Sequence, residues 1–200
     1  MVPTEKLSTR VRPRLLVRKQ RGGFALLEVL FAAAVLAIAI SGSAGAMLSA
    51  MQLDRVNREQ VAAVQAARRV LEQAQDVDFA EVFAAYNSVA GDDPAAMVAA
   101  GTVPGASFEC AGLNVQPGYA DGFSGEIIFP TVMNGGVLEL REDVVDPLLG
   151  MPADLNMDGV IDGLDHSGDY HVLPVRARVR WRGVTGNRTF DVVTMLSDRS

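Results

Sequence analysis

The sequence predicts an α+β protein in which a long amino-terminal helix packs on a carboxy-terminal antiparallel sheet of about four strands. Two patterns lead to this fold class. An apolar run begins at Phe24 and passes into an amphipathic pattern that ends near Gln75, and alternating apolar and polar residues follow between Val175 and Leu196. With 200 residues, 49% of them apolar, the chain can bury a core. Its one cysteine, Cys110, excludes an internal disulfide framework and is expected to be a small buried thiol.

The net charge of −6 divides unevenly along the chain. Residues 1–23 carry seven Lys or Arg and one acid, a net charge of +6, whereas the remaining 177 residues carry 11 Arg and 23 acids, a net charge of −12. A basic segment directly before an apolar run is expected to stay in the cytoplasm while the rest of the chain is exported. The acidic remainder does not favour nucleic acid as a partner.

The apolar run continues from Phe24 to about Met51, which is long enough to span a bilayer as a helix of about 30 Å. It contains one charged residue, Glu28, and a carboxylate inside a membrane helix costs about 2.5–3.5 kcal/mol on insertion scales. An uncleaved signal anchor or a secretory signal peptide cut after Ala46 would each account for the apolar run. Neither of them explains Glu28.

The residues Gly23-Phe24-Ala25-Leu26-Leu27-Glu28 resemble the prepilin cleavage motif of type IV pilins and type II secretion pseudopilins. This resemblance implies that a prepilin peptidase cuts after Gly23 and that the new terminus, Phe24, is N-methylated. It also implies that Glu28 pairs with the cationic amine of Phe24 in its own or a neighbouring subunit. The 23-residue leader is longer than many in the family.

Helix-forming residues continue beyond Met51 without a strong breaker, so we expect one helix from Phe24 to about Gln75. Within it, Ser41-Gly42-Ser43-Ala44-Gly45 is interpreted as a set of small residues for close helix packing, or alternatively as a segment that melts on assembly. Asp78 to Val89 is expected to form a short second helix. Residues 91–106, rich in Gly, Pro and Ala, are expected to form a surface loop.

The residue pattern of the carboxy-terminal part predicts antiparallel strands. Val175 to Arg182 alternates strictly, the segment around Gly183 and Asn187 supplies a turn, and Thr189 to Leu196 returns. Gly125 to Phe129 and Val137 to Leu140 are expected to be earlier strands. These four segments make up the predicted sheet.

The polar face of the strand 175–182 presents four arginines. One interpretation is a solvated face whose charges meet acidic neighbours in the fold or filament; the other is a phosphate-binding surface for nucleic acid. No aromatic residue alternates with the arginines to stack bases, which favours the first interpretation. The four residues are Arg176, Arg178, Arg180 and Arg182.

An acidic loop at residues 154–165 has the spacing of an EF-hand-type calcium loop. Oxygen-bearing side chains occupy positions 1, 3, 5, 9 and 12, and Gly159 stands at position 6, where the backbone turns sharply. The final Asp resembles the dockerin variant of this loop. The expected ligands of a structural Ca²⁺ are Asp154, Asn156, Asp158, the carbonyl group of Val160, Asp162 and Asp165.

The alternative is a solvated acidic turn. The flanking segments are poorly helical, since Pro147, Gly150 and Pro152 precede the loop, and a single loop of this kind does not predict a paired calcium sensor. His166 and His171 are expected to be loop residues, because calcium prefers oxygen ligands.

The sequence therefore predicts a prepilin that becomes a minor subunit of a type IV pilus or a type II secretion pseudopilus. Its partners would be the prepilin peptidase, other pilin or pseudopilin subunits and the membrane. The alternative is a membrane-anchored, calcium-dependent adhesion or scaffolding module that does not polymerise. No nucleophile or His-rich metal motif predicts an enzyme.

The expected segments are a cytoplasmic leader (1–23), a transmembrane or filament-core half-helix (24–50), an amphipathic half-helix with the short second helix (51–90), and an exported β domain (91–200).

Overall fold

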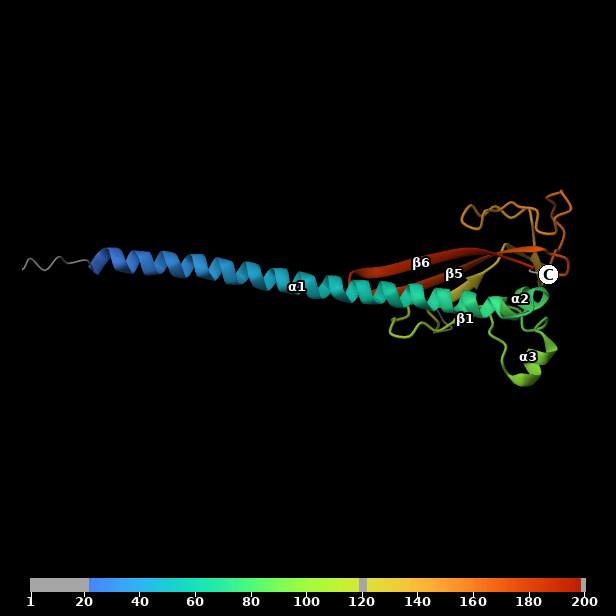
Figure 1. Ribbon diagram of the computed structural model, residues 1–200, viewed down its shortest axis with the longest axis horizontal. Helices are drawn as coiled ribbons and strands as arrows, with labels where there is room; N and C mark the ends of the chain where they lie inside the picture. The colour runs from blue at the N-terminus through green and yellow to red at the C-terminus, as the bar shows by residue number, and fades with distance from the viewer. Residues whose placement is uncertain (1–21, 119–121, 199–200) are drawn as a thin grey trace, which may run out of the picture. The chain divides into compact units, whose positions relative to one another are not determined.

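The computed structural model describes residues 22–118 and 122–198 (Figure 1). They divide into two compact units between Ser49 and Ala50, and each unit is described by itself below. Most of the predicted leader, residues 1–21, lies outside the described residues. One helix, α1 (Gly22–Gln75), supplies the first unit and continues into the second.

The first unit consists of the amino-terminal part of α1. Gly42 and Gly45 lie within the helix, so the small-residue segment is helical in the single chain. Neighbouring hydroxyl groups bond back to the helix, since Ser41 Oγ donates to the Ala37 carbonyl oxygen at 2.8 Å and Ser49 Oγ donates to the Gly45 carbonyl oxygen at 3.0 Å. These bonds satisfy the polar side chains without a partner helix.

Within the second unit, α1 buries one face of small and aliphatic side chains. Ala63 and Ala67 are fully buried, and Val70, Leu71 and Ala74 are nearly so. Their spacing is that of one helix face, and the alanines allow the backbone to come close to its neighbours. The predicted amphipathic half of the long helix is confirmed.

Two short helices follow. α2 (Phe79–Tyr86) begins at Asp78, whose carboxylate accepts a hydrogen bond from the Ala80 amide at 3.2 Å, so the predicted second helix is confirmed. α3 (Ala95–Ala100) lies in the segment that was expected to be a loop throughout. Pro94 precedes it, and Gly101 ends it in the left-handed conformation with φ of 67°. A proline before and a glycine after an alanine-rich run are sufficient for this one extra helix.

The main sheet has four antiparallel strands in the order β1 (Ser107–Phe108), β2 (Gly125–Ile128), β5 (Val172–Gly183) and β6 (Gly186–Ser197). The α+β class and the four-stranded sheet are confirmed. The assignment of Val137–Leu140 to that sheet is wrong, because this strand, β4, pairs with β3 (Thr131–Asn134) in a separate small sheet. The two-residue strand β1 takes the fourth place.

The core lies between the buried face of α1 and one face of β5. In Figure 1, β5 and β6 run along the carboxy-terminal half of α1. Val175, Ala177 and Val179 are fully buried and Trp181 is 2% exposed, as the alternation predicts. Trp181 also ties the strand to the helix, because its Nε1–H group donates to Glu59 Oε2 at 3.3 Å.

A second part of the core surrounds α2. The rings of Phe83 and Phe129 meet edge to face with centroids 5.3 Å apart. The Tyr170 hydroxyl donates to the Phe79 carbonyl oxygen at 2.6 Å and accepts from the Phe83 amide at 3.3 Å. Burial raises the pKa of Tyr170 to about 12, so the phenol stays protonated and α2 remains tied to the chain that leads into β5.

Candidate functional site

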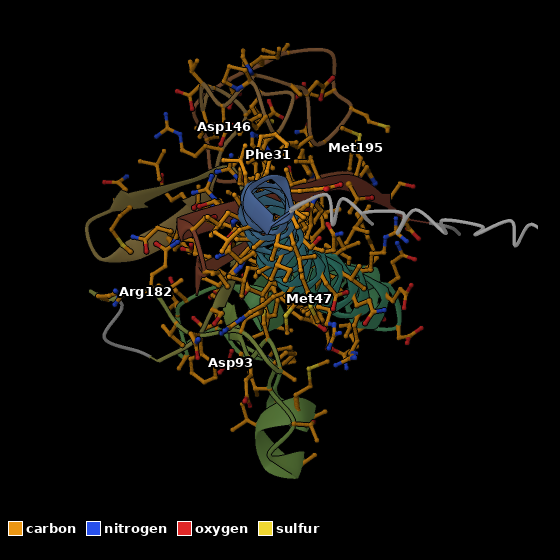
Figure 2. All side chains as sticks on the ribbon, turned by 90° about the vertical axis from the view of Figure 1, so that its left-hand side faces the viewer. Phe31, Met47, Asp93, Asp146, Arg182 and Met195 are labelled. Atoms are coloured by element: carbon orange, nitrogen blue, oxygen red, sulfur yellow. The ribbon has the colours of Figure 1, made fainter. Side chains whose placement is uncertain are left out.

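The amino-terminal part of α1 exposes its apolar side chains. Every side chain described from Ala25 to Ala50 is exposed, including Phe31 at 73% and Met47 at 67%. Figure 2 shows this part of α1 end-on, with Phe31 and Met47 labelled. Its length and composition suffice to cross a membrane. A continuous apolar surface of this kind needs lipid or other apolar helices around it.

Glu28 is the only charged residue of this exposed stretch. It lies in the second turn of α1 beside Leu27 and Phe31, and its side chain is exposed. Gly23 and Phe24, the residues on either side of the predicted cleavage point, lie in the first turn of the same helix. The helix therefore holds the proposed terminus and the acid about one turn apart.

The acidic loop is ordered by hydrogen bonds from its own backbone amides to its side chains. The Gly159 amide donates to Asp154 Oδ2 at 2.8 Å, and Gly159 has φ of 86°. The Asp158 amide donates to Asn156 Oδ1 at 3.1 Å, and the Val160 amide donates to Asp158 Oδ1 at 2.7 Å. Loop positions 1, 3 and 5 are thus brought together around the turn at position 6.

The remaining predicted ligands make other contacts. Asp162 Oδ1 accepts from the Leu164 amide at 2.8 Å, and Val160 lies at the exposed tip of the loop. Asp165 Oδ1 accepts from the amides of Leu140 and Ser167, each at 3.1 Å, and so joins the loop to the end of β4. In contrast, Asp154 Oδ1 is buried and has no hydrogen-bond partner among the described residues. Such an orphaned carboxylate oxygen, within a cluster of like charges, suits a hard cation.

Sequence reasoning missed Glu142, which is fully buried behind the loop. Its Oε1 accepts from the amides of Leu155 at 2.7 Å and Asn156 at 3.2 Å, and its Oε2 accepts from the amide of Asp162 at 3.2 Å. The Glu142 carboxylate thus accepts hydrogen bonds from amides near both ends of the loop. Glu142 precedes the loop by 12 positions, outside any motif, so nothing in the sequence spacing marks it.

His166 is buried among three carboxylates. Its Nδ1 lies 3.1 Å from Asp169 Oδ1, and its Nε2 lies 3.3 Å from Asp162 Oδ1 and 3.8 Å from Glu142 Oε2. The burial of His166 by itself lowers its pKa, but the hydrogen bonds to Asp162 and Asp169 and the charge of Glu142 outweigh that effect, and the pKa is raised. The expectation that His166 is a simple loop residue is therefore incomplete. His171 is exposed.

Three of the four arginines predicted on one face of β5 form ion pairs, and one of them, Arg176, is buried rather than solvated. Arg178 Nε lies 2.7 Å from Asp191 Oδ1, and Arg180 Nη2 lies 2.9 Å from Glu126 Oε2. Arg176 Nη2 lies 3.0 Å from Asp146 Oδ2. These contacts match the interpretation in which the arginines meet acidic neighbours within the fold.

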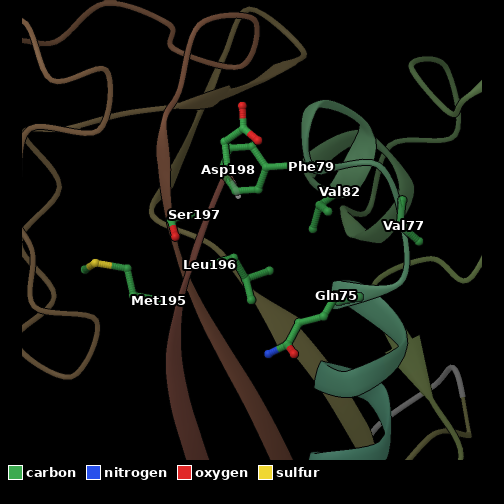
Figure 3. A pocket seen from close by; sticks show the side chains of 9 residues that line it. Gln75, Val77, Phe79, Val82, Met195, Leu196, Ser197 and Asp198 are labelled. Carbon is green, nitrogen blue, oxygen red and sulfur yellow. The ribbon is translucent and has the colours of Figure 1, made fainter. Parts of the chain in front are cut away.

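A cavity of about 410 Å³ lies at the end of α1 and shares no residue with the acidic loop (Figure 3). Its lining combines apolar and polar groups, and Asp198 is its one titratable side chain. The lining residues are Ala74, Gln75, Val77, Phe79, Val82, Met195, Leu196, Ser197 and Asp198.

Cys110 is 3% exposed, and burial, followed by the charge of Glu109, raises its pKa to about 11. The thiol is therefore protonated, as expected of a structural cysteine.

Comparison with known proteins gives one family match. Residues 18–44 match the prokaryotic N-terminal methylation motif, and this range contains Gly23, Phe24 and Glu28. No curated protein and no solved structure matches the chain. The methylation motif and the long exposed apolar helix that it overlaps are those expected of a type IV pilin-like prepilin anchored in a membrane.

Proposed function

We propose that this chain is a prepilin cut between Gly23 and Phe24 and assembled as a minor subunit of a type IV pilus or a type II secretion pseudopilus. Before assembly it would lie in the inner membrane as a single-pass protein, with its basic leader in the cytoplasm and its sheet domain exported. Afterwards it would belong to a periplasmic or extracellular filament. The observation that carries this proposal is the exposed apolar stretch of α1, residues 25–50, which overlaps the methylation motif matched at residues 18–44.

The proposed assembly mechanism uses the apolar side chains of the helix and one charge. Apolar side chains between Phe24 and Leu48 would pack against other subunits after leaving the lipid. Glu28, which is exposed on this helix, would form an ion pair with the cationic N-methylated amine of Phe24. The Phe24 amine becomes free only when cleavage removes the leader, so processing would have to precede assembly.

Mass spectrometry of the mature amino terminus tests the processing step. Co-expression of the full chain with a prepilin peptidase should give a product that lacks residues 1–23 and begins with N-methyl-Phe24. Omitting the peptidase provides the control, in which Met1 should remain. A chain that keeps Met1 in the presence of an active peptidase would contradict the proposal and favour the non-polymerising, membrane-anchored adhesion or scaffolding module.

We also propose that the acidic loop binds a structural Ca²⁺. The residues that would hold it are Asp154, through its orphaned Oδ1, with Asn156, Asp158, the Val160 carbonyl group and Asp162. Asp165 is the remaining candidate ligand, although its Oδ1 already accepts two amide hydrogen bonds. Bound Ca²⁺ would neutralise like charges within 12 residues and order the loop against β4. Its role would be structural rather than enzymatic.

Calorimetry on the full chain in detergent tests the calcium proposal. Binding of one Ca²⁺ with a dissociation constant of about 0.1–1 mM is expected, as in extracellular modules. Asp158→Ala should weaken binding at least about tenfold, because it removes a ligand from the centre of the loop. Asp93→Ala is the control and should bind like the parent chain. Absence of binding heat at millimolar Ca²⁺ would overturn the proposal.

A further inference from the structure

A second group of metal-ligating side chains lies behind the acidic loop. Glu142 and His166 are 0% and 3% exposed, and Asp162 lies beside them. One ligand atom from each of the three side chains lies within 4.8 Å of the other two. This group differs from the calcium loop in composition, because it includes a buried imidazole and a glutamate from outside residues 154–165.

The spacing of these atoms fits a small divalent transition metal. Ligand atoms bound about 2.0–2.1 Å from a tetrahedral zinc stand about 3.3 Å apart. The distances from His166 Nε2 to Asp162 Oδ1 and to Glu142 Oε2 are 3.3 and 3.8 Å. Calcium is a poorer fit, since it takes about six to eight oxygen ligands and this group offers two carboxylates and a nitrogen.

The outer contacts of the group are also those of a metal site. Asp169 Oδ1 lies 3.1 Å from His166 Nδ1, so a carboxylate can hold the proton on that nitrogen and leave Nε2 free to bind a metal. Glu142 Oε1 is fixed by the amides of Leu155 and Asn156. The side chain of Asp162 is 35% exposed and provides a route from solvent.

The group carries an excess of negative charge that a cation would balance. Three carboxylates face one imidazole, so even a protonated His166 leaves a net charge of −2. Among the described residues, His166 is the ion-pair partner recorded for the buried Glu142. Arg141 lies against Gly163 nearby, but it is paired with Asp143 at 2.7 Å and Glu139 at 3.6 Å. A divalent ion would balance the remaining charge.

We propose that Glu142, Asp162 and His166 bind one zinc-type divalent ion, with Asp169 as the outer partner that orients His166. A fourth ligand position would be left for water. The site would fasten the acidic loop to the end of β4 from its buried side. This inference does not depend on filament assembly. Asp162 is a proposed ligand of both sites, so it would offer one carboxylate oxygen to each ion when both are bound.

Zinc titration of the full chain in detergent, with saturating Ca²⁺ present, tests the inference. One Zn²⁺ per chain is expected, and Co²⁺ in its place should give the visible absorption of a low-symmetry four-coordinate ion. His166→Gln should weaken Zn²⁺ binding at least about 100-fold, and Asp169→Asn should weaken it about 10- to 100-fold. His171→Gln replaces the exposed histidine as a matched control and should leave Zn²⁺ binding unchanged.

Two further readouts separate this site from the calcium loop. Asp158→Ala should weaken Ca²⁺ binding and leave Zn²⁺ binding intact, whereas His166→Gln should do the reverse. Circular dichroism of each variant identifies any loss of fold, and Asp169→Asn, altered at an exposed position, provides the test if His166→Gln unfolds. Absence of Zn²⁺ binding, equal binding by His166→Gln and the parent chain, or displacement of Zn²⁺ by Ca²⁺ would overturn the inference.

Discussion

Glu28→Ala is expected to leave cleavage after Gly23 intact but to reduce incorporation of the subunit into filaments about 10- to 100-fold. A charged hydrogen bond contributes about 1.5–3 kcal/mol, which corresponds to this range in an association constant. Alanine at position 28 should also ease insertion into the membrane, because it removes the cost of a carboxylate there. The measurement compares the amounts of processed subunit in the membrane and in sheared filaments.

Two variants show whether the charge of Glu28 is responsible. Glu28→Gln keeps the shape and a hydrogen-bonding oxygen, so it should be incorporated less well than the parent chain but better than Glu28→Ala. Ser41→Ala changes another exposed polar residue of the same helix, one whose hydroxyl group donates to the Ala37 carbonyl oxygen. It should behave like the parent chain. Normal incorporation of Glu28→Ala would refute the proposed pairing.

The elements with long periodic patterns could be predicted from the sequence. α1 follows from an apolar run that passes into an amphipathic one, and the pair β5 and β6 follows from strict alternation, with Val175 and Trp181 buried and Arg178 on the other face. These patterns are long enough for burial on one face to determine both element type and register.

Short elements could not be placed in the same way. β1 has two residues and exists because Ser107 and Phe108 pair with β2, a long-range contact that no local pattern reveals. β3 and β4 are joined by Gly135 and Gly136, with φ of 58° and 91°, so this turn did signal a local hairpin. The prediction that β4 belongs to the main sheet overlooked that turn.

The candidate sites likewise divide into those that residue spacing predicts and those that it does not. The methylation motif and the acidic loop are contiguous, so residue spacing alone marks Glu28 and Asp154. Glu142 directly follows β4, and His166 comes close to it only because the chain after the loop returns to the end of β4, where the His166 amide donates to the Leu140 carbonyl oxygen at 2.9 Å. Burial of a charged side chain is a property of the tertiary structure, and one glutamate in a sequence carries no sign of it.

Glu142→Ala is expected to lower the free energy of unfolding of the sheet-containing unit by about 3–5 kcal/mol. The substitution leaves three loop amides without their acceptor, those of Leu155, Asn156 and Asp162. It also leaves the buried His166 without one of its carboxylate neighbours. Trp181 is the single tryptophan and is buried in the core, so its fluorescence during denaturant unfolding of the full chain, with chelator present, reports this loss.

The matched control is Glu139→Ala, which removes a carboxylate three positions earlier. Glu139 Oε2 lies 3.6 Å from Arg141 Nη1 on a partly exposed part of β4, and such pairs contribute about 0–1 kcal/mol. A similar small loss for Glu142→Ala would mean that the loop amides find other acceptors, in which case Glu142 would not organise the loop. A large loss restricted to Glu142 would show that the acidic loop depends on a residue outside its own motif. Its affinity for any cation would then be set partly by the end of β4.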